Sequence, residues 1–250
     1  MLFERILSRY RQILFWLLLL LLFGAHAALD PAANLRQQMS ARFGAARLPV
    51  LDEWQAMLNA STTLNDAAKL KLTNDFFNKN IVFDSDINIW QKSDYWATPL
   101  ETMGRGQGDC EDYAIAKYYS LLILGVPVKQ MRLVYVKAQF ETVAGPVQQA
   151  HMVLAYYDKP SADPQILDNL IPTIRKASQR PDLSPVFSFN SEGIFAGVSS
   201  QENGSIGRTD RLSRWEELMR RARAEGFDAL VQKSLSQQRS TRTSAATGSN

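Results

Sequence analysis

The stretch that decides the fold of this chain is Gly106-Gln107-Gly108-Asp109-Cys110-Glu111-Asp112-Tyr113. Cys110 is the only cysteine among 250 residues, and it stands between a glycine-rich turn and a helical pattern. The positive end of a helix dipole favours thiolate over thiol, and the thiolate is the nucleophilic form. The position is therefore typical of a catalytic cysteine. The alternative is a buried structural cysteine, but those lie in apolar surroundings, whereas Cys110 is flanked by carboxylates.

The first 27 residues have the pattern of a secretory signal peptide. Three arginines precede an apolar run at 13–23, and Ala25-His26-Ala27 supplies the small residues of a cleavage site. The run is shorter than the roughly 20 residues of a membrane-spanning helix. We therefore expect cleavage after Ala27 and export to a bacterial periplasm, with an uncleaved inner-membrane anchor as the alternative.

Export changes what the cysteine and the charge imply. Disulfides are the usual use of cysteine in an oxidising compartment, and they need two cysteines, so a lone one favours catalysis. The formal net charge is +3, of which residues 1–27 contribute three Arg and one Glu. The near-neutral remainder has no electrostatic footprint for nucleic acid, and we expect no nucleic-acid partner.

The remaining sequence predicts a single α+β domain over residues 28–232. Apolar periodicity predicts helices at 50–80 and 111–124, the second ended by Gly125 and Pro127, and an amphipathic basic helix at 209–232. Strands are expected at 131–136, 151–157 and 165–170, and at 187–195 with a break at 191–193. A loop is expected at 78–94. Residues 233–250 have almost nothing to bury, which predicts a disordered tail.

A nucleophilic thiol needs a base, and the base needs an orienting group. After signal cleavage His151 is the one histidine left. Asp168 lies on the next expected strand, with Asn169 as the rival orienting residue. If Val153 pairs opposite Asp168, then His151 and Asp168 share one sheet face, and a slip of one residue separates them. Sequence alone leaves this register open.

Three carboxylates, Asp109, Glu111 and Asp112, surround the cysteine. Negative neighbours raise the pKa of a thiol and so oppose the helix dipole. A bound cation relieves this conflict, and carboxylate oxygens suit calcium. The alternative is that they are simply favourable residues for a helix N-terminus.

Three motifs together resemble one family. Gly108-Asp109-Cys110-Glu111-Asp112-Tyr113-Ala114, Ala150-His151-Met152 and Leu167-Asp168-Asn169 are similar to the bacterial transglutaminase-like cysteine proteinases of the LapG type, over roughly residues 45–200. The resemblance implies a transglutaminase/papain-like core. In it, a catalytic cysteine begins a central helix packed on an antiparallel sheet that carries the histidine and aspartate.

The resemblance also implies roles and partners. Cys110 is then the nucleophile, His151 the general base and acid, and Asp168 the orienting residue. Asp109, Glu111 and Asp112 are the implied calcium ligands. Such enzymes cut the N-terminal region of a large surface adhesin at a dialanine site and so release cells from a biofilm. They are inhibited by the periplasmic domain of an inner-membrane cyclic-di-GMP receptor.

Several readings stay open at this point. A transglutaminase-type acyltransferase or a peptidoglycan endopeptidase needs the same three residues. A periplasmic binding module that keeps the fold is the non-enzymatic alternative. The backbone N–H of Cys110 is the expected oxyanion donor, with Gln107 and Trp96 as alternatives for a second donor.

Overall fold

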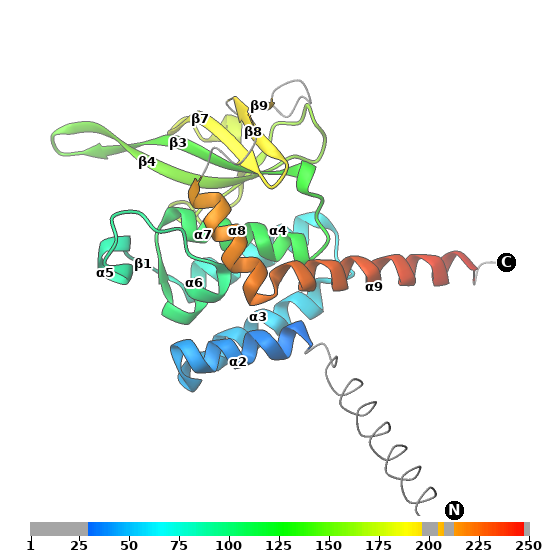
Figure 1. The fold of residues 1–250 in the computed structure, drawn as a ribbon. Helices are drawn as coiled ribbons and strands as arrows, with labels where there is room; N and C mark the ends of the chain where they lie inside the picture. The colour runs from blue at the N-terminus through cyan, green and yellow to red at the C-terminus, as the bar shows by residue number, and fades with distance from the viewer. Residues whose placement is uncertain (1–29, 197–204, 208–212, 248–250) are drawn as a thin grey trace, which may run out of the picture.

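The computed structural model describes residues 30–196, 205–207 and 213–247. A seven-stranded antiparallel sheet lies against a layer of helices, as Figure 1 shows. The order of the strands in this sheet is β6-β5-β4-β3-β7-β8-β9. The predicted α+β class is confirmed. The expected signal peptide lies outside the described residues.

The helical layer holds most of the first half of the chain and its C-terminal part. Its α-helices are α2 (Pro31–Phe43), α3 (Leu48–Ser61), α4 (Asp66–Asn80), α5 (Asp86–Trp90), α6 (Pro99–Arg105), α7 (Cys110–Ile123), α8 (Ser213–Glu225) and α9 (Phe227–Thr247). Short 3-10 helices lie at Ala45–Arg47, Val128–Gln130 and Ala177–Gln179.

The strands form two sheets of unequal size. β1 (Val82–Phe83) pairs in parallel with β2 (Gln107–Gly108), directly before Cys110. The large sheet contains β3 (Met131–Thr142), β4 (Gly145–Tyr156), β5 (Gln165–Leu167), β6 (Arg175–Lys176), β7 (Leu183–Asn190), β8 (Gly193–Ala196) and β9 (Ser205–Gly207). The long β3–β4 hairpin extends beyond the body of the molecule (Figure 1).

The main core lies between the sheet and the helices, and α7 runs through it. Almost every side chain of α7 is buried. Trp54 of α3 donates from Nε1 to Ser120 Oγ of α7 at 2.9 Å. Trp215 of α8 packs its ring edge-to-face against Tyr118 of α7, with ring centroids 5.8 Å apart. The helix that begins with the cysteine is thus fixed from several sides.

The outer face of the sheet carries a second, smaller apolar cluster. It consists of Val134, Val136, Val153, Ala155, Tyr157 and Ile166. Ala177, which follows β6, and Leu183, which begins β7, pack against it. The connection between these two strands also carries Arg180.

Several expected elements differ in their limits. The helix expected at 50–80 is two helices, α3 and α4, and part of the loop expected at 78–94 forms α5. The helix expected at 209–232 is interrupted at Gly226, whose φ of 103° is a left-handed value that favours glycine. Residues 233–247 continue α9, where the sequence predicts a disordered tail. This stretch contains no glycine or proline that would end a helix begun at Phe227.

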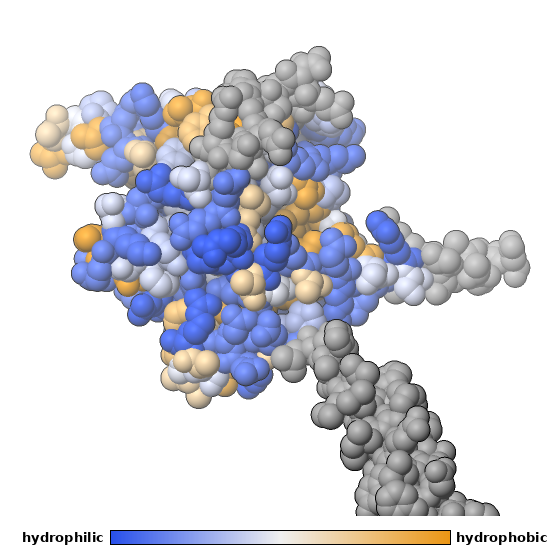
Figure 2. Space-filling model, viewed as in Figure 1, coloured by the Kyte–Doolittle hydropathy of each residue, from blue (hydrophilic) through white to orange (hydrophobic). Residues whose placement is uncertain are grey.

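Hydrophilic residues cover most of the coloured face in Figure 2, including the region of α8. Among the described residues, no helix is both long and apolar enough to cross a membrane.

A pair of substitutions on α4 tests this arrangement of the core. Phe77 is fully buried, whereas Leu72 on the same helix is 39% exposed. Phe77→Ala should lower the free energy of unfolding by about 3–5 kcal/mol, because it leaves a cavity. Leu72→Ala should cost less than about 1 kcal/mol. Urea denaturation measures both, and equal losses would contradict the packing described.

Candidate active site

Cys110 is the first residue of α7, and two glycines before it allow the chain to turn tightly into this helix. Gly106 ends α6 with a φ of 68°, in the left-handed region. At Gly108 a Cβ atom would lie 2.8 Å from the Asp112 Cβ, closer than side chains tolerate. The chain therefore turns tightly and passes directly over Asp112 before the helix begins.

The thiol of Cys110 lies against β4. It accepts a hydrogen bond from the Met152 backbone N–H, and it donates one to the Glu111 carboxylate. Burial raises the pKa of the thiol, and the Glu111 and Asp109 carboxylates raise it further. Since Met152 follows His151, the fold brings the predicted nucleophile to the strand of the predicted base.

His151 and Asp168 meet as the sequence-based hypothesis requires. Leu154 of β4 pairs with Leu167 of β5, and continuing this register places Val153 opposite Asp168. His151 Nε2 lies 2.8 Å from Asp168 Oδ1, and both residues are buried. The sequence left the register open, and the structure has the register that brings His151 and Asp168 together. With Nε2 engaged, Nδ1 is the ring nitrogen left to exchange a proton.

Arg180 is a further member of this network that the sequence did not reveal. Its Nη2 lies 2.8 Å from Asp168 Oδ2 and 2.7 Å from Asp182 Oδ2. Asp168 Oδ1 also accepts from the Leu170 backbone N–H. Burial raises the pKa of Asp168, but hydrogen bonds from His151, Leu170 and Arg180 outweigh it and hold the pKa at about 2. The carboxylate is therefore ionised and fixed at both oxygens.

The main chain of Asp168 is tied to the cysteine-bearing helix. Its carbonyl accepts from Asn78 Nδ2 at 2.9 Å and from Lys117 Nζ at 3.1 Å. Lys117, two turns after Cys110 on α7, is fully buried and also donates to Asn74 Oδ1 and Asn78 Oδ1. Burial lowers the pKa of Lys117 to about 7. These bonds fix the distance between α7 and the end of β5.

The predicted acidic residues gather around the start of α7, and one acidic residue joins them that the sequence did not indicate. Carboxylate oxygens of Asp86, Asp109 and Asp112 lie within 4.8 Å of one another. Asp109, Cys110 and Glu111 form a second such group. Asp86 begins α5, in the segment predicted as a loop, and no motif linked it to the cysteine.

The cluster has the donor set of a site for a hard cation. Burial raises the pKa of Asp86 to about 6 and that of Asp109 to about 10, and it raises the pKa of Asp112 well above its usual range. Asp86 Oδ1 and Asp109 Oδ1 are buried, and among the described residues they have no hydrogen-bond partner. Buried carboxylate oxygens without donors are costly unless a cation coordinates them. The residues present therefore fit calcium.

The two alternatives for a second oxyanion donor differ in their contacts. Gln107 donates from Nε2 to Asp84 Oδ2 at 2.9 Å, so its amide is already engaged. Trp96 is buried and stacks on Phe189, and its Nε1 has no hydrogen-bond partner within the described part of the chain. Of the two, Trp96 has the free donor.

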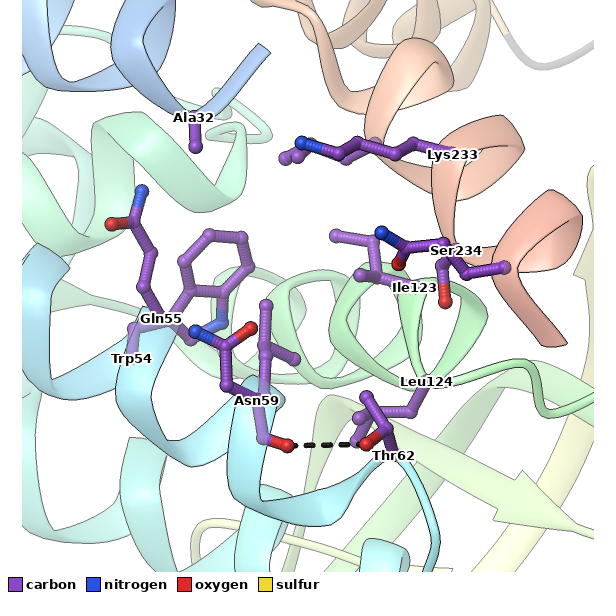
Figure 3. A pocket seen from close by; sticks show the side chains of 12 residues that line it. Ala32, Trp54, Gln55, Asn59, Thr62, Ile123, Leu124, Lys233 and Ser234 are labelled. Atoms are coloured by element: carbon purple, nitrogen blue, oxygen red, sulfur yellow. Dashed lines mark hydrogen bonds between the residues drawn. The ribbon is translucent and has the colours of Figure 1, made fainter. Parts of the chain in front are cut away.

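A cavity of about 190 Å³ lies away from this site, between α3, α9 and the C-terminal end of α7. Figure 3 shows Trp54, Gln55 and Asn59 of α3 facing Lys233 and Ser234 of α9 across it. Cys110 begins the opposite end of α7, about 20 Å away at 1.5 Å per residue. This cavity is therefore not where the thiol acts.

The role of Arg180 in holding the Asp168 carboxylate can be tested through the stability of the protein at acid pH. A carboxyl with a lowered pKa stabilises the folded state above its unfolded value of about 4. That stability is lost as the pH falls towards about 2. Arg180→Gln removes a donor from Asp168 and should bring its folded-state pKa closer to the unfolded value. The variant should therefore be less stable at neutral pH and lose less further stability between about pH 4 and 2 than the unmodified protein.

The control for this experiment is Arg175→Gln, which removes an exposed arginine of the neighbouring β6. Urea denaturation between pH 2 and 7 gives the free energy of unfolding of each variant. Identical pH dependence for the two variants would show that Arg180 does not hold the Asp168 carboxylate.

Comparisons with known proteins agree with the fold described above. The family model of the bacterial transglutaminase-like cysteine proteinases (BTLCP) matches residues 52–181. The structure of EGTA-treated Legionella pneumophila LapG has 34% identity and a TM-score of 0.64, and the match covers 76% of this chain and 96% of that one. Calcium-bound LapG from the same organism has 35% identity and a TM-score of 0.62, with 74% and 96% covered. No curated protein matches significantly.

The family match spans more than half of the chain, and it includes Cys110, His151 and Asp168. The predicted resemblance is confirmed at the level of family and fold. On this evidence the chain belongs to the bacterial transglutaminase-like cysteine proteinases.

Proposed function

We propose that this protein is a calcium-dependent periplasmic cysteine endopeptidase with Cys110, His151 and Asp168 as its catalytic triad. One observation carries the proposal. A single thiol at the start of α7 lies against the strand of a histidine that is hydrogen bonded to a fixed, ionised aspartate. Family membership supports the cysteine-protease chemistry.

The reaction follows from the roles these residues can take. His151 removes the proton of the Cys110 thiol, and the thiolate attacks the carbonyl of the scissile peptide bond. Asp168 holds the imidazole through Nε2, so Nδ1 accepts the proton and delivers it to the leaving amine. His151 then activates water, which hydrolyses the thioester and frees Cys110. The Cys110 backbone N–H is the proposed oxyanion donor.

Asp86, Asp109, Glu111 and Asp112 are the proposed calcium ligands. Bound calcium supplies positive charge beside the thiol, which favours the thiolate that the carboxylates alone disfavour. The chain's own residues position this charge: Asp109 and Glu111 flank Cys110, and Asp112 anchors the turn at Gly108. The existence of calcium-bound and EGTA-treated structures of LapG supports the choice of metal.

The proposed substrate is the N-terminal region of a large cell-surface adhesin, cut at a dialanine site to promote biofilm dispersal. The proposed inhibitor is the periplasmic domain of an inner-membrane cyclic-di-GMP receptor, which sequesters the enzyme. Both rest on the likeness to LapG-type proteinases. A neighbouring gene for a very large, repetitive secreted protein would support the substrate.

Cleavage of an adhesin N-terminal fragment tests the nucleophile. Cys110→Ala should lower the cleavage rate at least roughly 1000-fold, because no other thiol is present to form the thioester. Gel analysis and mass spectrometry identify the products. Circular dichroism of the variant shows whether the fold is kept.

The products also separate the alternatives. Amine-crosslinked fragments in place of cut ones would favour a transglutaminase. Cleavage of peptidoglycan peptides but not of the adhesin would favour a cell-wall endopeptidase. Undiminished cleavage by a folded Cys110→Ala variant would overturn the proposed nucleophile, and no reaction on any of these substrates would favour a binding module.

Asp86→Asn tests the metal site. Replacing this charged ligand by a neutral amide should weaken calcium binding by roughly 10-fold or more, and chelation by EGTA should abolish cleavage. The control is Asp75→Asn, which affects a surface ion pair with Lys71 on α4. Calorimetric titration measures the affinity. Full activity in EGTA would refute calcium dependence.

A further inference from the structure

The basic helix α8 lies outside the residues matched by the family model, yet it is firmly packed on the core. Trp215, Leu218 and Ala222 on one side of α8 are fully buried. Trp215 contacts the aromatic rings of Tyr118 on α7 and Phe189 on β7. This packing fixes the position of α8, and with it the arginines that contact the segment next to the acidic cluster.

Residues 94–97, here called the 94–97 segment, lie in the connection between α5 and α6 and contact the acidic cluster through their main chain. The Tyr95 N–H donates to Asp86 Oδ2, and the Ala97 N–H donates to Asp112 Oδ1 at 2.7 Å. Each bond engages one oxygen of a proposed calcium ligand. At Asp86 the other oxygen, Oδ1, is the one left without a partner among the described residues.

The alternate residues of the same segment are held by α8. Arg221 Nη2 donates to the Trp96 carbonyl at 2.6 Å, and Arg214 Nη2 lies 2.9 Å from Asp94 Oδ2. Arg221 also pairs with Glu101 of α6 and lies over the Tyr95 ring, 4.4 Å from its centroid. The 94–97 segment thus contacts α8 through a hydrogen bond and an ion pair, and it is hydrogen bonded to the acidic cluster through its main chain.

From this juxtaposition we propose that Arg221 is a positioning residue for the calcium site, and that α8 sets calcium affinity by holding the 94–97 segment. The inference rests on the proposed calcium site. Its physical basis is preorganisation: N–H groups that are already in place orient Asp86 and Asp112, so binding costs less conformational entropy. The side chain of Arg214 is half exposed to solvent, so its ion pair with Asp94 contributes less to holding the segment than Arg221 does.

Calorimetric titration of calcium into the purified protein, stripped with EGTA, tests the inference without using proteolysis. Arg221→Gln should weaken calcium binding roughly 10-fold or more, since partners of metal ligands commonly have effects of this size. Arg221→Lys keeps the charge and should recover part of the affinity. The matched control is Arg220→Gln, which changes the adjacent, exposed arginine of α8 and should leave the affinity unchanged.

A second variant keeps the test valid if Arg221→Gln fails to fold. Arg214→Gln removes only the rim contact to Asp94 and should weaken binding by about threefold. Urea denaturation in EGTA reports whether each variant is folded before calcium is added. If Arg221→Gln folds and binds calcium as tightly as the unmodified protein, the positioning role is overturned; if it does not fold, unchanged affinity of Arg214→Gln overturns it.

The two proposals fail in different ways. If the unmodified protein binds no calcium, the proposed metal site is wrong and this inference falls with it. If the unmodified protein binds calcium and Arg221→Gln binds it equally well, the metal site stands and only the role of α8 is wrong.

Discussion

The burial of several carboxylates beside one thiol, at the start of α7, is the constraint on which the rest of the structure depends. Each of these groups is easier to bury when protonated, and each raises the pKa of its neighbours. The glycine turn brings Asp112 under the chain, and α5 brings Asp86 alongside. This electrostatic cost opposes stability, and it holds together the oxygen ligands that the proposed calcium site requires.

Two hydrogen-bonded supports hold this acidic centre in place. On one side, Asp168 is held at its carboxylate by His151 and Arg180, and at its carbonyl by Asn78 and Lys117. On the other, the 94–97 segment joins the acidic cluster to α8. Both supports use hydrogen bonds between elements far apart in sequence, so a change in either would move the site without touching the thiol.

Local chemistry made part of the site predictable. A cysteine that follows a glycine turn and precedes an apolar helix can be recognised as a candidate from a short stretch of sequence. The same is true of the acidic residues beside it. The sequence left the register between β4 and β5 open, and the observed register joins His151 to Asp168. Arg180, Lys117 and Asp86 carry no such local pattern. Each reaches the site through a separate element, and a lone charged residue looks the same in sequence whether it is solvated or buried.

The sequence by itself determined the family, the α+β class, and the nucleophile, base and orienting residue as candidates, because these depend on spacing within single helices, strands and turns. Only the tertiary structure decided which groups complete the site. Asp86 joins the acidic cluster, Arg180 and Lys117 fix Asp168, and α8 holds the 94–97 segment. The physical reason is that burial and hydrogen bonding between distant elements arise only when the helices pack on the sheet, and no local periodicity encodes them.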